Sequence, residues 1–114
     1  MLPFLQCKKG KVLSLFPFTH LYFVTSMESL VFNEWLPAGT IATNINRQLE
    51  EIGYKNLGVN ARPNLVVLRR TDMPAVLVEV GFINNDQDNA LLDAQFDATA
   101  RAIADGIAGT LWTW

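Results

Sequence analysis

Cysteine and histidine are almost absent from this 114-residue chain, which has one of each, Cys7 and His20. A single cysteine cannot form an internal disulfide, and it leaves no second thiolate for a metal site. An excess of charge of one sign is also lacking, because nine Lys and Arg residues against eleven Asp and Glu residues give a net charge of −2. Interspersed charge of this size gives no electrostatic case for an anionic membrane surface, and we expect no nucleic-acid partner.

A long hydrophobic run and a glycine-rich phosphate loop are missing as well. The apolar stretch at residues 12–24 is too short and too interrupted to predict a membrane span, so no transmembrane segment is expected. It follows Lys8, Lys9 and Lys11 in the layout of a signal peptide, but no small-residue cleavage site comes after it, so the export signal stays open. We favour a buried strand or an irregular segment there. No glycine-rich loop follows either predicted strand, which leaves a nucleotide-binding function with little support.

The chain does contain an amphipathic pattern in its middle. Ile41, Ile45, Leu49 and Ile52 recur at spacings of four and three, and Gly53 supplies a typical helix end. This pattern predicts a helix that packs on a sheet.

Two short apolar runs, residues 65–68 and 75–78, are rich in valine and predict two strands joined by a compact loop over residues 69–74. Asn85 or Asp86 can cap a last helix over residues 86–111. The order helix, strand, strand, helix is typical of a layered α/β domain, with a sheet and flanking helices. The last helix carries one apolar stripe that we expect to be core: Leu92, Phe96, Ala100, Ile103, Ile107 and Leu111.

One carboxylate, Glu79, lies in an otherwise apolar run that predicts a buried strand. Charged residues are rarely buried without a partner or a function. A carboxylate whose solvation is reduced has the raised proton affinity that a general acid or base needs near neutral pH. Pairing with Arg69 or Arg70 would explain Glu79 equally well, and from this residue alone both interpretations stay open.

The segment that contains Glu79, Met73-Pro-Ala-Val-Leu-Val-Glu-Val-Gly-Phe-Ile-Asn-Asn85, resembles a motif of a known enzyme family. From residue 56 to residue 85 the chain is similar to the C-terminal half of zinc-dependent N-acetylmuramoyl-L-alanine amidases of the amidase 3 type, which are bacterial and phage peptidoglycan hydrolases. Residues 38–53 and 86–111 resemble the family helices on either side. The resemblance implies an incomplete amidase 3 domain over residues 28–114, preceded by a divergent apolar segment over residues 1–27.

The resemblance also implies an activity and a place of action. The reaction would be hydrolysis of the amide between N-acetylmuramic acid and L-alanine in peptidoglycan, in the cell envelope or outside the cell. Glu79 matches the family's catalytic acid/base beside the metal, and Arg69 would face substrate carboxylates. An ion pair of Arg69 with Glu79 or Asp72 is the alternative.

Zinc, the cofactor that the resemblance implies, is held in the family by two histidines and a glutamate. His20 precedes Glu79 by 59 positions, which suits the second family histidine, so His20 is the candidate metal ligand. Its flanks, Phe18-Thr-His-Leu-Tyr22, are a poor copy of the family motif, and the glycine-flanked motif of the first histidine is missing. Glu28 and Glu34 are oxygen donors that follow His20, whereas the family's ligand glutamate precedes its second histidine, and we interpret both as solvated surface charges.

The segment around Glu79 resembles the catalytic segment of the family, but the set of zinc ligands is incomplete. Two hypotheses explain this combination. Either the chain is a truncated or rearranged amidase domain, or it is a degenerate α/β domain that binds cell-wall peptide or a protein partner without cutting. A third, unrelated hypothesis is a small non-enzymatic α/β interaction module, which predicts that Glu79 is neutralised by a salt bridge and that no concave site opens beside it.

Overall fold

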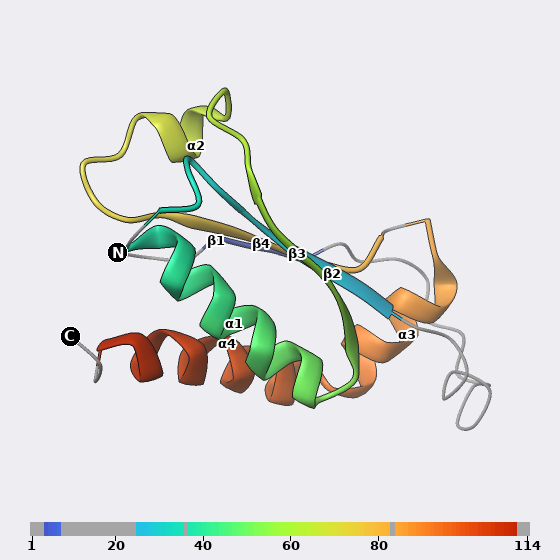
Figure 1. The fold of residues 1–114 in the computed structure, drawn as a ribbon. Helices are drawn as coiled ribbons and strands as arrows, with labels where there is room; N and C mark the ends of the chain where they lie inside the picture. The colour runs from blue at the N-terminus through green and yellow to red at the C-terminus, as the bar shows by residue number, and fades with distance from the viewer. Residues whose placement is uncertain (1–3, 8–24, 36, 83, 112–114) are drawn as a thin grey trace.

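A computed structural model describes residues 4–7, 25–35, 37–82 and 84–111 (Figure 1). His20 and the whole apolar stretch at residues 12–24 lie outside these residues. In chain order the elements are β1 (Phe4–Cys7), β2 (Thr25–Val31), α1 (Ala38–Glu51), β3 (Tyr54–Ala61), α2 (Val66–Arg69), β4 (Val76–Val80), α3 (Asp86–Ala94) and α4 (Phe96–Leu111).

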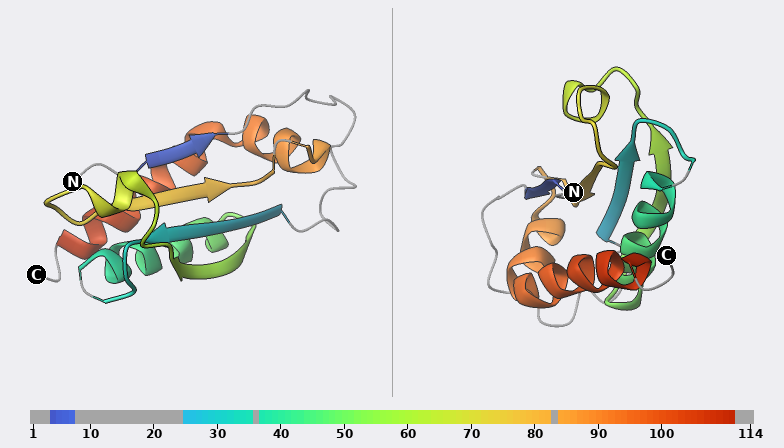
Figure 2. Two further views of the ribbon diagram at one scale, coloured as in Figure 1. Left: turned by 90° about the horizontal axis from the view of Figure 1, so that it is seen from above. Right: turned by 90° about the vertical axis from the view of Figure 1, so that its left-hand side faces the viewer.

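The four strands form one mixed sheet in the order β1-β4-β2-β3. β4 pairs with β1 in parallel and with β2 in antiparallel, while β2 and β3 are parallel. The left view of Figure 2 shows this order along the sheet, with β4 between β1 and β2. β4 is therefore held by backbone hydrogen bonds along both of its edges.

The main core lies between one face of the sheet and the two long helices, α1 and α4 (Figure 1). β2 and β4 contribute buried side chains at every second position, as expected for strands that bury one face. Tyr54 at the start of β3 reaches Thr99 of α4, and their hydroxyl oxygens lie 2.9 Å apart. On the opposite face, α2 and the segments beside it make a smaller apolar cluster: Leu30, Leu68, Ala75, Leu65 and Leu77.

The predicted middle helix and the second predicted strand are confirmed. The helix is α1, which ends at Glu51, and Gly53 has the positive φ of +109° that suits glycine after a helix. The strand at residues 75–78 is β4, which extends to Val80. The layered α/β fold class is confirmed with them.

The strand predicted at residues 65–68 is wrong, because residues Val66–Arg69 form the short helix α2. Backbone hydrogen bonds from Leu68 and Arg69 to the carbonyl of Leu65 close local turns there instead of pairing with a neighbouring strand. A four-residue apolar run does not distinguish a strand from a turn of helix by periodicity.

The single terminal helix predicted over residues 86–111 is also wrong, because it is interrupted at Gln95, whose φ of −130° is not helical. The side chain of Gln95 donates instead to the carbonyl oxygen of Ile52 at 3.2 Å. Because the two helices do not continue one another, the predicted stripe is only partly core. Leu92 and Ile103 are buried, whereas Phe96, Ala100 and Leu111 are exposed.

Candidate active site

Glu79 lies near the end of β4, on the face of the sheet away from α1 and α4. The alternate residues Val76, Val78 and Val80 are buried in the main core, and Glu79 is half-buried on the other side. Its backbone is opposed by Gln6 of β1 on one edge and by Glu28 of β2 on the other. Because β4 is paired on both edges, the backbone of Glu79 is held rigidly in the interior of the sheet. A residue in a loop would be held less rigidly.

The chain turns sharply just after Glu79. Gly81 has a φ of +85°, and its N–H donates to the carbonyl oxygen of Ser26 at 2.9 Å. The next N–H, of Phe82, donates to the Oδ2 atom of Asp88 at 2.7 Å. A Cβ on residue 81 would lie 3.0 Å from the Cβ of Asp88. Glycine is therefore favoured at this position for two reasons, its positive φ and the close approach of α3.

Asp88 is the carboxylate that holds this turn from the first turn of α3. The residue is 4 % exposed, and its own N–H donates to the Oδ1 atom of Asn85, which caps the helix as predicted. Burial raises the pKa of the Asp88 carboxyl, and the hydrogen bond from Phe82 acts in the opposite direction. Sequence reasoning missed Asp88, although its position three residues after a capping asparagine places it against the helix start.

Glu28 is the second carboxylate at this place. It is half-buried on β2, directly opposite Glu79, and its Oε2 atom accepts a hydrogen bond of 3.0 Å from the side-chain amide of Asn60. Interpreting Glu28 as a solvated surface charge was therefore wrong, whereas Glu34 is exposed as expected. The opposition of Glu28 and Glu79 could not be predicted, because neither β2 nor β3 was predicted.

The described part of the chain does not form a metal site. It contains no group of three or more His, Cys, Asp or Glu side chains that could hold a metal ion. Glu28 and Glu79 supply only two carboxylates, and zinc sites in proteins usually have three or four N, S or O ligands from the protein. The predicted ligand His20 lies outside the described residues.

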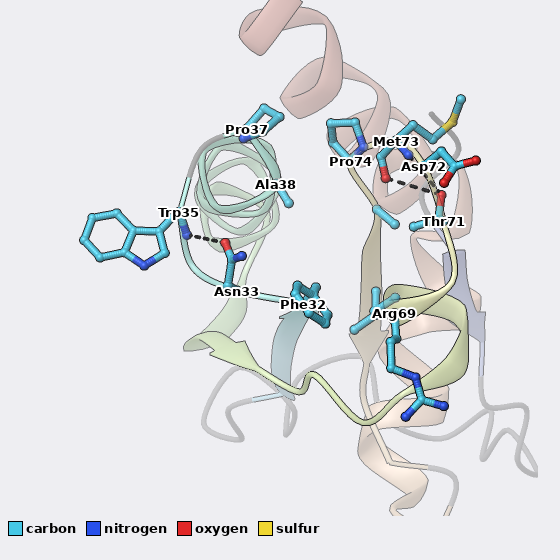
Figure 3. A pocket seen from close by; sticks show the side chains of 12 residues that line it. Phe32, Asn33, Trp35, Pro37, Ala38, Arg69, Thr71, Asp72, Met73 and Pro74 are labelled. Carbon is cyan, nitrogen blue, oxygen red and sulfur yellow. Dashed lines mark hydrogen bonds between the residues drawn. The ribbon is translucent and has the colours of Figure 1, made fainter.

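Arg69 lies at the C-terminus of α2, away from Glu79, and lines a cavity of about 410 Å³ (Figure 3). This cavity is bounded by the segment after β2, the start of α1 and the loop before β4, and Glu79 is not among its lining residues. In Figure 3 the side chain of Arg69 extends away from that of Asp72. The structure therefore places the two predicted site residues, Arg69 and Glu79, toward opposite ends of β4.

Comparison with known proteins agrees with the sequence motif. Residues 34–109, about two thirds of the chain, match the family described as N-acetylmuramoyl-L-alanine amidase. The matched range includes α1, β3, β4 and nearly all of α4, and it therefore includes Glu79.

Two curated relatives are similar over a little more than half of the chain. The endolysin of Bacillus phage SPP1 is 42% identical over 69 residues, which are 59% of this chain and 25% of the relative. A Staphylococcus epidermidis protein named "Probable cell wall amidase LytH" is 33% identical over 70 residues, which are 60% of this chain and 24% of the relative. The chain thus matches about a quarter of the length of these relatives.

A solved structure has a similar fold over most of the chain. The N-acetylmuramoyl-L-alanine amidase AmiC2 of Nostoc punctiforme superposes with a TM-score of 0.67 at 27% identity. The superposition covers 78% of this chain and 49% of that protein. The chain therefore spans about half of the AmiC2 structure.

Proposed function

Because the chain belongs to the N-acetylmuramoyl-L-alanine amidase family, we propose that it hydrolyses the amide between N-acetylmuramic acid and L-alanine in peptidoglycan. The observation that carries the proposal is the family match over residues 34–109, within which Glu79 lies half-buried near the end of a doubly paired strand. The relatives' names support action at the cell wall. We therefore propose the cell envelope or the outside of the cell as the place of action.

Glu79 acts in this proposal as the general base and then as the general acid. Its carboxylate takes a proton from the attacking water while the water oxygen bonds to the amide carbonyl carbon. The same carboxyl group then gives the proton to the amine of L-alanine as the C–N bond breaks. The products are the lactyl carboxylic acid of N-acetylmuramic acid and a free peptide amine, so atoms and protons balance.

Zinc enters only as an expectation from the family resemblance. The described residues do not form a site for it, and the proton transfers proposed above involve Glu79, water and the amide. His20 remains the proposed ligand.

Contact of Arg69 with a carboxylate of the peptide stem is the substrate-binding part of the proposal. Its support is that Arg69 is exposed and lines a cavity to which the exposed apolar residues Phe32, Trp35 and Met73 also contribute. A guanidinium pairs with a carboxylate through two parallel hydrogen bonds. Because this cavity does not include Glu79, a peptide bound there would have to extend along the sheet to reach the carboxylate.

The test is a Glu79→Gln variant assayed on purified peptidoglycan for release of new L-alanine amino groups. Glutamine keeps the shape of the side chain but cannot carry the proton, so release should fall by about 10²-fold or more. Glu51→Gln is the matched control, because Glu51 is exposed on α1 at the opposite face of the sheet, and it should keep full activity.

Release by Glu79→Gln at the rate of the unchanged chain would contradict the role of Glu79. If the folded, unchanged chain releases nothing but binds insoluble peptidoglycan, the alternative of a non-catalytic binding domain is favoured.

A further inference from the structure

The cavity that Arg69 lines and the carboxylate of Glu79 lie toward opposite ends of one strand. Ala75, the lining residue closest to Glu79 in the sequence, precedes it by four positions. Residues of a strand rise by about 3.3 Å each, so roughly 13 Å separate these two positions. Because β4 is paired along both of its edges, this separation is fixed by the sheet.

The two places also share one face of the sheet. Side chains alternate between the two faces of a strand, so Ala75, Leu77 and Glu79 point the same way. The three valines of β4 point into the main core on the other side. Ala75 and Leu77 belong to the apolar cluster that contains Leu68 of α2. A ligand that begins at Glu79 can therefore follow this face toward the cavity.

The cavity has the size and the lining of a site for the end of a peptide. Its volume of about 410 Å³ lies within the range of about 300–1,000 Å³ that is usual for ligand pockets. Most of its lining residues are apolar, and two, Arg69 and Asp72, are charged. Within the described residues Arg69 makes no side-chain hydrogen bond or ion pair, and in Figure 3 its side chain extends away from that of Asp72. Its positive charge can therefore pair with a carboxylate of a ligand.

The separation of about 13 Å selects peptides by their length. An extended peptide spans at most about 3.3–3.6 Å per residue, so two residues reach about 7 Å and four residues reach about 14 Å. The peptide stem of peptidoglycan begins at the amide on which Glu79 is proposed to act. A stem of two residues therefore ends short of the cavity, whereas a stem of four residues brings its C-terminal carboxylate to it.

We propose that this cavity is a second substrate subsite, in which Arg69 holds the C-terminal carboxylate of the peptide stem and so selects stems of four or more residues. This inference rests on the proposed function, because it takes the peptide stem as the ligand and Glu79 as the acid/base. Binding energy from a remote part of a substrate can be used at the reacting centre. In an active chain, shorter stems should therefore have a lower kcat/KM.

The experiment measures the binding of synthetic N-acetylmuramoyl peptides to the Glu79→Gln chain by isothermal titration, so that no ligand is hydrolysed. Peptides of two and of four residues are compared, each with a C-terminal carboxylate and with a C-terminal amide. The four-residue carboxylate should bind about tenfold more tightly than the four-residue amide, because only the carboxylate forms charged hydrogen bonds with Arg69. The two-residue carboxylate and amide should bind equally, because neither end reaches the cavity.

A second substitution, Arg69→Gln in the same chain, should abolish the preference for the four-residue carboxylate over its amide. Arg70→Gln is the matched control, because Arg70 is the next residue, is equally exposed and is not among the residues that line the cavity. It should keep the preference. If Arg69→Gln does not fold, the comparison of the carboxylate with the amide still decides, since it needs no substitution in the cavity.

Three results would overturn the proposal: no preference for the four-residue carboxylate, the same preference in the two-residue peptides, or a preference that remains in Arg69→Gln. Failure of every peptide to bind would overturn it as well. Because the titration needs no hydrolysis, it separates this proposal from the proposed function. A length-dependent preference that requires Arg69, in a chain that releases no amino groups from peptidoglycan, would contradict only the proposed hydrolysis. Release without such a preference would contradict only the subsite.

Discussion

At the scale of single residues, Asp88 links the stability of the fold to the turn after Glu79. Burial raises its pKa above the ordinary value of 3.8, so the fold favours the protonated form. The stabilisation from this protonation is complete below pH 3.8 and is lost as the pH rises through the raised pKa. Asp88→Asn is neutral throughout, and its amide oxygen can still accept from Phe82. The free energy of unfolding of the unchanged chain, minus that of Asp88→Asn, should therefore fall as pH rises through this window.

Urea unfolding at a series of pH values measures this difference. Asp86→Asn, at an exposed position on the same helix, is measured in parallel as the control for removing a charge at the start of α3. A difference for Asp88 that rises with pH would mean that the hydrogen bond from Phe82 outweighs the burial of the carboxyl group.

The individual residues of the site differ in whether they could be predicted from the sequence. Glu79 could be singled out, because one charge inside an apolar run is visible without a structure. Glu28 and Asn60 could not, because their importance depends on strand register. A shift of one residue would have turned Glu28 to the other face of the sheet.

At the scale of elements, the sequence patterns identified α1 and β4, but they predicted a strand at the short helix α2, joined α3 and α4 into one helix, and missed β2 and β3. β3 is an edge strand that carries Lys55, Asn56 and Asn60, and its bulge at Gly58 breaks the alternation of faces. Edge strands often have polar side chains and bulges, so they lack the period-two pattern that identifies a strand. Tertiary pairing, not local propensity, decides such segments.

The packing of α1 against α4 depends on one glycine. A Cβ on Gly106 would lie 2.6 Å from the Cα and 2.7 Å from the nitrogen of Ile45, and both are backbone atoms that cannot rotate away. Gly106→Ala should therefore push the helices apart and lower the free energy of unfolding by about 1–3 kcal/mol. Thermal and urea unfolding of the variant measure the loss.

Gly109→Ala is the matched control on the same helix, because among the described residues no atom outside the neighbouring helix backbone lies within 4 Å of the added Cβ. Alanine is the better helix former, so this variant should gain up to about 1 kcal/mol. Equal stability of the two variants would mean that α1 and α4 can separate without cost.

At the scale of the whole molecule, the fold and the candidate acid/base are present in a chain that spans about half of the AmiC2 structure. No described helix is long and apolar enough to cross a membrane. The described residues hold β4 rigidly from both edges and cover its core face, and this is sufficient to position Glu79. Whether the chain positions an acid/base carboxylate and whether it binds a metal are therefore separate questions, because the sheet can position the carboxylate without completing a metal site.

An experiment on zinc binding tests whether the chain has a metal site. His20 is the only histidine of the sequence, and the described residues offer no site without it, so His20→Ala should lose stoichiometric zinc binding in an isothermal titration. Cys7→Ser is the control for the only thiol, and it should bind zinc as the unchanged chain does. Equal zinc binding with and without His20 would contradict its assignment as a ligand. No zinc in the unchanged, folded chain would contradict zinc dependence in this form, and it would favour the non-catalytic hypothesis if peptidoglycan release were absent as well.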